Sequence, residues 1–287
     1  MTAVLPPNIV LDEYLKNWLL EDIGRGDRST AGLFSTEIPE GNAVWIVKET
    51  GVIAGLTIAA RVFHLLNEKV DFTPAVSEGY FCEKGKIIAR INGPLDVLLT
   101  GERVALNLAM RLSGIATMTR KYAEKIADLP TQLVDTRKTT PGLRILEKYA
   151  TAVGGAINHR MGLDDAVMIK DNHIAAAGGI GEAIAKIKKT IPYPLTIEVE
   201  TENLEQVKEA IAHQADIIML DNMSIETMKK AVELIRQQNN NIKIEASGNI
   251  TLETIRGVAE TGVNYISTSA PITRSPWLDL SMKINNC

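Results

Sequence analysis

The sequence has little cysteine, few aromatic residues and no long apolar run. Cysteines occur only at Cys82 and Cys287, which show neither metal-ligand spacing nor a disulfide framework. Aromatic residues make up 5% of the 287 residues, which gives no support for the base-stacking surfaces of single-strand nucleic-acid binders. No apolar run approaches the roughly 20 residues of a membrane-spanning helix. We therefore expect neither a disulfide scaffold, nor a nucleic-acid partner, nor a membrane protein.

The net charge and the absence of several common motifs exclude further classes of function. The net charge of -4 argues against general binding to nucleic acid or to membrane surfaces. The N-terminal residues lack a basic segment followed by an apolar core, so we expect no signal peptide and a cytoplasmic location. No Walker P-loop, no GxGxxG after a first strand, no Ser-His-Asp order and no cysteine nucleophile is evident.

The first part of the chain predicts a small α+β layer. Helices are expected at 9–22 and 57–66, and strands at 43–48, 52–54, 70–73 and 87–91. Residues 95–128 predict two helices broken at Ser113-Gly114. We assign residues 1–112 to an N-terminal α+β, sandwich-like domain, and the C-terminal tail, about residues 271–287, is a candidate to pack back on it.

After Pro130 strand-like and helix-like segments alternate. Strands are expected at 133–134, 167–169, 195–199, 217–220, 242–246 and 265–268, and helices at 142–153, 180–190, 203–213, 225–238 and 251–260. This alternation predicts parallel strands covered by helices, as an open doubly wound sheet or as a barrel. Polar or small residues follow all six strand ends, which favours the active face of a (β/α) barrel, assigned here to residues 113–270.

Five groups that are, or can become, cationic gather at two strand ends and one loop. They are Arg137, Lys138, His159, Arg160 and Lys170. A solvated charged face fits poorly, because the segments TRKTT and NHR contain no acid. Two like charges about 4 Å apart repel by roughly 4 kcal/mol near a protein surface. A fold tolerates such a cluster when an anion binds among the cations, so we predict an anion site.

Acidic and small residues follow the remaining strands. Glu200 and Asp221 either form structural salt bridges with the cations or hold Mg²⁺ or sugar hydroxyls beside a polyanionic ligand, and the excess of cations favours the second interpretation. The small residues of the two late loops, Ser247-Gly248-Asn249 and Thr268-Ser269, leave backbone N–H groups for a phosphate. Together these features predict a phosphorylated substrate that also carries carboxylates.

These motifs carry a family resemblance. The segment DTRKTTPGLRILEKYA, followed by the NHRMGL and IKDNHI blocks, resembles quinolinate phosphoribosyltransferase, and the resemblance extends from EDIGRGD through TGERVALN to IEVE, IMLDN, EASGNI and LDLSMKI. It implies an N-terminal α+β domain plus an incomplete (β/α) barrel. It also implies phosphoribosyl transfer from phosphoribosyl pyrophosphate to quinolinate with decarboxylation, Mg²⁺ as cofactor, and a homodimer or a hexamer.

The resemblance and the residue chemistry together give a predicted site. Lys138, Lys170, Glu200 and Asp221 are the predicted catalytic residues, and Glu200 and Asp221 the predicted metal ligands, directly or through water. Residue chemistry alone favours a structural pairing of Arg103 with Glu102 or another acid, whereas the resemblance implies that Arg103 enters the neighbouring subunit's site. The predicted substrate-binding set is Arg103, Thr136, Arg137, Lys138, His159, Arg160, Lys170, Glu200, Asp221, Ser247, Gly248, Asn249, Thr268, Ser269 and Ala270.

The chain departs from the family pattern at two places. Ala156 stands where a third glycine is usual, and Ser269 with Thr273-Arg274-Ser275 stands where the family often has glycine and then Thr-His-Ser. Three alternatives remain: a paralogous type II phosphoribosyltransferase of the kind found beside molybdate transport genes, a phosphosugar enzyme with an ordinary barrel, and a non-catalytic binding module. Arg103, Arg137, His159 and Arg160 are predicted to bind two carboxylates, and this dicarboxylate clamp disfavours the paralogous transferase. The NHR block disfavours the phosphosugar enzyme, and the retention of Glu200 and Asp221 disfavours the binding module.

Overall fold

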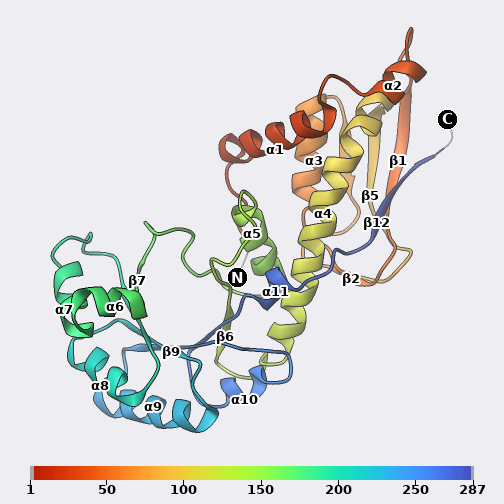
Figure 1. Ribbon diagram of the computed structural model, residues 1–287. Coiled ribbons are helices and arrows are strands. Elements are labelled where there is room, and N and C mark those ends of the chain that lie inside the picture. Colours follow the sequence, from red (N-terminus) through yellow and green to blue (C-terminus); the bar gives the residue numbers. More distant parts are fainter. Residues whose placement is uncertain (1–2, 286–287) are drawn as a thin grey trace. The chain divides into compact units, whose positions relative to one another are not determined.

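The computed structural model describes residues 3–285, so Cys287 lies outside the described part of the chain. The chain forms two compact units (Figure 1). The first takes the residues up to Arg120, then Thr140–Gly154 and the residues from Arg274 onward, and the second takes Lys121–Thr139 and Gly155–Thr273. The boundary predicted after residue 112 falls inside one continuous helix, α4 (Leu95–Glu124), and stays a prediction.

The first unit is built on an antiparallel sheet with strand order β12-β1-β5-β3. Its strands are β1 (Glu40–Val47), β3 (Asp71–Pro74), β5 (Ile87–Pro94) and β12 (Leu280–Asn285). The late strand β12 pairs with β1 along its whole length, from Leu280 opposite Val47 to Asn285 opposite Asn42. Two short strands, β2 (Gly51–Val52) and β4 (Phe81–Cys82), form a separate antiparallel pair.

Among the described residues, five helices accompany this sheet: α1 (Asn8–Ile23), α2 (Arg28–Leu33), α3 (Leu56–Leu66), α4, and α5 (Arg144–Gly154). The apolar residues of α3 recur at helical spacing and are buried, and Phe63 from this helix meets Trp45 of β1 and Phe72 of β3 in an aromatic cluster. Trp45 and Phe63 are fully buried. Burial of such large side chains is the main stabilising term for a layer of this size.

The predicted helix break at Ser113-Gly114 is wrong, because α4 runs through it. The Ser113 hydroxyl accepts a hydrogen bond from the Ala54 N–H and donates one to the Ala54 carbonyl, so this residue joins α4 to the segment after β2. A Cβ on Gly114 would collide with the backbone of Pro276. The two small residues therefore allow close packing on a helix instead of ending it.

The second unit is a six-stranded parallel sheet with strand order β6-β11-β10-β9-β8-β7. Consecutive strands from β7 to β11 lie side by side, and β11 also pairs with β6. This is the topology of a barrel left open between β6 and β7. The predicted incomplete barrel is confirmed. Its strands are β6 (Gln132–Val134), β7 (Val167–Ile169), β8 (Ile197–Thr201), β9 (Ile217–Asp221), β10 (Lys243–Ser247) and β11 (Tyr265–Ser267).

Helices alternate with these strands, and the sequence pattern predicted four of the six described ones, those at 180–187, 204–212, 225–238 and 255–259. The six are α6 (Asp171–Ala177), α7 (Ile180–Ile187), α8 (Leu204–Ala212), α9 (Ile225–Gln238), α10 (Ile255–Ala259) and α11 (Ala270–Thr273). Polar side chains cap the N-termini of two of these helices. Asn203 accepts a hydrogen bond from the Gln206 N–H at the start of α8, and Ser224 accepts one from the Thr227 N–H at the start of α9. Among the described residues, no helix is both long and apolar enough to cross a membrane.

Candidate active site

A cavity of about 730 Å³ lies at the carboxyl ends of the barrel strands, within the second unit. Most of the predicted site residues line it, although they are far apart in the sequence. The lining consists of Thr136, Arg137, Lys138, His159, Arg160, Met168, Lys170, Glu200, Met219, Asp221, Asn222, Glu245, Ser247, Gly248, Asn249 and Ser267. The parallel register explains this convergence, because the carboxyl ends of all six strands point to one end of the barrel.

The loop after β6 brings Arg137 and Lys138 to the cavity. Arg137 is half-buried, and its Nε has no hydrogen-bond partner among the described residues, whereas Lys138 is exposed. A turn fixes the loop, since the Thr136 hydroxyl accepts from the Lys138 N–H and the Arg137 carbonyl accepts from the Thr139 N–H. A buried guanidinium nitrogen without a partner is costly, so this orphan atom indicates a place for an anionic ligand.

The segment between α5 and β7 lies beside β6 and carries His159 and Arg160. Ile157 pairs with Val134 of β6, and the buried Asp135 accepts hydrogen bonds from the Asn158 amide at 2.7 Å and from the His159 N–H at 2.8 Å. Burial, and then the neighbouring guanidinium of Arg137, lower the pKa of Arg160. The two arginines thus crowd each other, which an anionic ligand would relieve.

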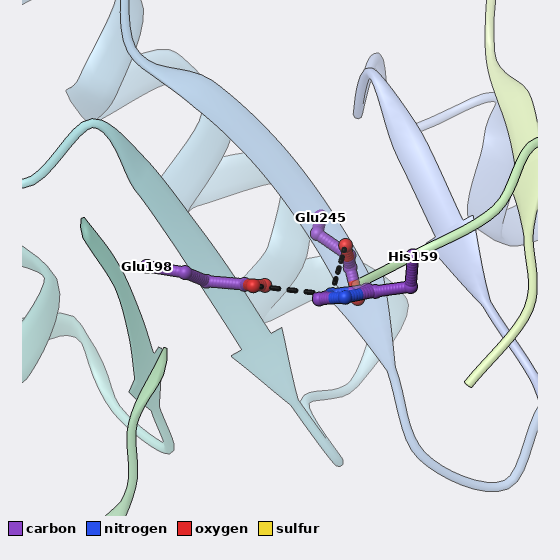
Figure 2. Close-up of side chains that lie close together, drawn as sticks. All are labelled: His159, Glu198 and Glu245. Atoms are coloured by element: carbon purple, nitrogen blue, oxygen red, sulfur yellow. Dashed lines mark ion pairs between the residues drawn. The ribbon is translucent and has the colours of Figure 1, made fainter. Parts of the chain in front are cut away.

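Two buried glutamates face His159 from the barrel interior (Figure 2). The His159 Nε2 lies 3.1 Å from Oε2 of Glu198, on β8, and 3.6 Å from Oε2 of Glu245, on β10. The other nitrogen, Nδ1, accepts a hydrogen bond from the Arg160 N–H at 2.8 Å. Burial, with the charge of Glu198 next, raises the pKa of Glu245 to about 8.

An opposed pair of charges lies at the ends of β7 and β8. The Lys170 Nζ is 3.3 Å from Oε2 of Glu200. Burial raises the pKa of Glu200, with Lys170 acting against that shift and Asp221 reinforcing it. Glu200 and Asp221 therefore form a carboxylate pair on neighbouring strands, with one cation beside it.

The loops after β9 and β10 are joined by side-chain amides. The Asn222 amide donates to Asp221 at 2.6 Å, and the Asn249 amide donates to Asn222 at 3.0 Å. Asn222 and Asn249 both have φ of 53°, and a Cβ on Gly248 would collide with the Asn222 side chain. Left-handed backbone at non-glycine residues is uncommon and concentrates at binding sites, so these loops are built for a defined conformation.

Comparison with known proteins identifies the family. Models of the quinolinate phosphoribosyl transferase N-terminal and C-terminal domains match residues 29–113 and 115–283. The chain belongs to the quinolinate phosphoribosyltransferase family. It is 61% identical to a probable nicotinate-nucleotide pyrophosphorylase [carboxylating] from Synechocystis over 98% of this chain and 94% of the relative, and 46% identical to that of Bacillus subtilis over 96% and 94%.

Solved structures agree with this assignment. NadC from Streptococcus pyogenes is similar with a TM-score of 0.93 at 41% identity, covering 98% of this chain and 99% of the other. The nicotinate-nucleotide pyrophosphorylase from Francisella tularensis gives a TM-score of 0.92 at 37% identity, covering 99% of both chains. The mixed fold of this chain is therefore that of its family.

Four predicted residues of this quinolinate phosphoribosyltransferase family member do not line the cavity: Arg103, Thr268, Ser269 and Ala270. The Thr268 N–H donates to the Val134 carbonyl, and the Ala270 N–H to the Thr268 hydroxyl, so both are used inside the barrel. Ser269 precedes α11, and Arg274, which stands where the family often has histidine, is exposed and belongs to the first unit. Ala156 is buried.

Arg103 lies on α4 in the first unit. Its Nη2 is 4.0 Å from Oε1 of Glu102 and its side chain is 60% exposed. The contact is long and solvated, so the pairing expected from residue chemistry contributes little. Arg103 also lines a cavity of about 590 Å³ within the first unit, together with Trp18, Arg111 and Trp277.

Sequence reasoning missed the layer beneath the strand ends. Asp135, Glu198 and Glu245 are buried and contact the segment that carries His159 and Arg160, yet none was predicted as a site residue. The signal was the alternation along two strands, because Glu198 precedes Glu200 by two residues and Glu245 precedes Ser247 by two. Residues two apart on a strand point to the same face, so these glutamates point into the barrel, one layer deeper.

Proposed function

We propose that this protein transfers a phosphoribosyl group from phosphoribosyl pyrophosphate to quinolinate and releases CO₂, giving nicotinate mononucleotide and pyrophosphate in de novo NAD biosynthesis. The observation that carries the proposal is the crowding of Arg137 and Arg160 in one cavity, with the Arg137 Nε buried and unpartnered among the described residues. Quinolinate brings two carboxylates, and planar guanidinium groups bind carboxylates bidentately. Homologues at 61% and 46% identity carry the corresponding name, which disfavours the paralogous transferase acting on another acceptor.

The residues support a sequence of bond changes without a covalent enzyme intermediate. The ring nitrogen of quinolinate forms a bond to C1 of the sugar as the bond from C1 to the pyrophosphate oxygen breaks. The carbon–carbon bond to the 2-carboxylate then breaks, CO₂ leaves, and a proton takes its place. Arg137 and Arg160 hold the acceptor, while Lys138 and Lys170 balance the phosphates, so positioning and electrostatic stabilisation supply most of the catalysis.

Mg²⁺ is part of the proposal. Mg²⁺ prefers oxygen ligands and is usually held by one or two carboxylates plus water and substrate phosphates. Glu200 and Asp221 fit this description, since the charge of Asp221 helps to raise the pKa of the half-buried Glu200, and a divalent cation would offset that repulsion. The ion would neutralise charge on the pyrophosphate that leaves. Direct ligation and ligation through water both fit.

A homodimer, or a hexamer built from dimers, completes the proposal. Arg103 is exposed on the first unit, consistent with a role in the neighbouring subunit's site. Arg103→Ala subunits and Arg160→Ala subunits should each be inactive, and a mixture should regain part of the activity, because one hybrid site contains both arginines. Absence of recovery despite proven subunit exchange would contradict donation across the interface. We also propose a cytoplasmic location, consistent with the scarcity of cysteine.

The acceptor tests the function. With phosphoribosyl pyrophosphate and Mg²⁺, quinolinate should be consumed, whereas nicotinate, which has one carboxylate, should not be consumed at a comparable rate. Comparable turnover of nicotinate would contradict the dicarboxylate clamp. The same assay separates this activity from the two remaining alternatives, because a phosphosugar enzyme and a binding module would leave both acceptors unchanged.

A further inference from the structure

We propose that Glu198 and Glu245 are positioning residues of the acceptor pocket, which hold His159 as a neutral imidazole with its proton on Nε2, while the same ring holds the backbone of Arg160 through Nδ1. The inference concerns the His159 cluster, defined as His159, Glu198 and Glu245 (Figure 2). It deepens the proposed function, on which it rests only for the identity of the acceptor. It also revises the sequence-based interpretation, in which His159 was one of the cationic groups of an anion site.

The hydrogen bond to Nδ1 decides the form of the ring. The Arg160 N–H is a donor that cannot reverse, and it lies 2.8 Å from Nδ1. An imidazole nitrogen accepts a hydrogen bond only when it carries no proton. The proton of a neutral ring is then on Nε2, which donates to Glu198 at 3.1 Å. An imidazolium would place an N–H at Nδ1 against the Arg160 N–H.

Two aspartates of the chain make the same kind of hydrogen bond, in which a side chain accepts from the N–H of the next residue. The Asp96 side chain accepts from the Val97 N–H, and the Asp171 side chain from the Asn172 N–H, at 2.8 and 2.7 Å. At His159 the imidazole Nδ1 takes the place of the carboxylate oxygen. The ring therefore fixes the peptide that leads into Arg160, the residue whose guanidinium also donates to the Ala166 carbonyl at 2.9 Å.

The ligand atoms of the His159 cluster lie within 4.8 Å of one another, a spacing that would suit a metal ion. The second nitrogen argues against it. A histidine that binds a metal through Nε2 almost always donates an N–H from its other nitrogen to an acceptor. Here the partner of Nδ1 is itself a donor, the Arg160 N–H. The ring is arranged for a proton on Nε2 rather than for a metal.

The two glutamates of the His159 cluster have different roles. Both are almost fully buried, and Oε1 of each has no partner among the described residues. The groups that face Glu245 are Glu198 from β8, His159, Asp135 after β6, and Ser267 from β11, which donates a hydrogen bond to it. Burial, and then the charge of Glu198, raise the pKa of Glu245, so Glu245 is the protonated member, and Oε2 of Glu198 accepts the hydrogen bond from Nε2.

The His159 cluster forms part of the wall between two cavities. One is the candidate active site, and the other, of about 250 Å³, is lined by the first residues of several strands, among them Val167, Ile217 and Tyr265. His159, Arg160 and Glu245 line both cavities. Loss of the Glu245 side chain would open the floor of the acceptor pocket and release the ring that fixes Arg160.

Kinetics distinguish a positioning ring from a cationic one. Asparagine at 159 can accept the Arg160 N–H as aspartates do elsewhere in the chain, whereas lysine supplies a cation but no acceptor. The His159→Asn enzyme should have a quinolinate KM at least about tenfold lower than that of the His159→Lys enzyme. Glu245→Ala should raise the quinolinate KM more than Glu245→Gln does, because glutamine resembles the protonated acid. The reverse order in either pair would overturn the proposal.

The ring itself can be observed in the intact enzyme without substrate. The chain has four histidines, so ring ¹⁵N–¹H spectra of histidine-labelled protein are simple, and the His159→Asn spectrum assigns the signal. Between about pH 5 and 8 His159 should stay neutral with its proton on Nε2. Formation of an imidazolium at His159 near neutral pH, or a proton on Nδ1, would overturn the proposal. Because no substrate is present, this result is independent of the quinolinate assay.

Discussion

The ammonium group of Lys170 lies 3.3 Å from the Glu200 carboxylate, across the ends of two neighbouring parallel strands. The pair joins the cationic and acidic parts of the site. Lys170 follows β7 and Glu200 lies in β8, where Ile169 is opposite Val199. Lys170 can therefore contact a phosphate while it restrains a carboxylate proposed to bind Mg²⁺.

Replacement of Lys170 by methionine should weaken use of the sugar substrate. The variant keeps most of the side-chain volume but removes a charged donor, which is worth roughly 1.5–3 kcal/mol, or about ten- to a hundredfold in kcat/KM for phosphoribosyl pyrophosphate. Steady-state kinetics measure this. The control is Lys208→Met, since Lys208 forms a surface pair with Glu205 at 2.7 Å, and it should leave the kinetics unchanged. Equal kinetics of both variants would place Lys170 outside the substrate site.

Replacement of Glu245 by glutamine should change how stability depends on pH. Burial raises the pKa of Glu245 from 4.5 to about 8, so between these values the folded state binds more protons than the unfolded state. The contribution of protonated Glu245 to the free energy of unfolding is then complete below the unfolded-state pKa and is lost as the pH rises towards about 8. Glutamine removes this loss. The free energy of unfolding of Glu245→Gln, relative to the unsubstituted protein, should be higher at about pH 8 than at about pH 5.

The control for this pH effect is Glu253→Gln. Glu253 is exposed, and a hydrogen bond from Thr251 lowers its pKa, so it is ionised in both states over this range. Urea unfolding of the two variants at both pH values is the measurement. A pH-independent difference between Glu245→Gln and the unsubstituted protein would mean that Glu245 is ionised in the fold.

Arg111 should be needed for stability of the first unit. Its guanidinium lies 2.8 Å from the Glu147 carboxylate, which is fully buried and also accepts from the Thr140 N–H and hydroxyl. Arg111→Met leaves that carboxylate buried without its cation, so unfolding should become easier by about 3–5 kcal/mol. Arg256→Met, which breaks a solvated pair with Asp128, should have a much smaller effect. Similar urea midpoints for both variants would contradict this role.

Gly114 should tolerate no side chain although it lies in a helix. Alanine favours helix over glycine by about 1 kcal/mol, but a Cβ at position 114 would collide with the backbone of Pro276. Gly114→Ala should therefore destabilise the protein. Gly32 in α2 has open space around its would-be Cβ, so Gly32→Ala should be neutral or stabilising. Thermal unfolding of both variants tests this, and equal shifts in Tm would show that the close approach is relieved by movement.

The sequence was sufficient for the barrel and for the strand-end residues, because periodicity and polar strand ends are local signals. Arg137, Lys170, Glu200 and Asp221 each follow or end a short apolar run, and all four line one cavity. The alternation rule could have placed Glu198 and Glu245 on the same inner face. It could not show that their layer packs around His159, because that depends on the course of residues 157–160 beside β6.

Elsewhere the local signals were misleading. Ser113-Gly114 carries the usual signal for a helix break, yet contacts distant in sequence, with Ala54 and Pro276, keep the helix continuous. From residue type alone, His159 was also predicted to be one of the cationic groups of the anion site. Its form depends on the backbone N–H of Arg160, which no pattern of residue types reveals.

The most direct test of the proposed reaction follows the carboxyl carbon that leaves quinolinate as CO₂. Quinolinate labelled in its 2-carboxylate should release labelled CO₂ in a one-to-one ratio with nicotinate mononucleotide, and only when phosphoribosyl pyrophosphate and Mg²⁺ are present. Arg137→Lys should keep the ratio but require more quinolinate, because it keeps the charge and loses the planar fork. Nucleotide formed without labelled CO₂, or no reaction of the unsubstituted enzyme, would contradict a decarboxylating phosphoribosyl transfer.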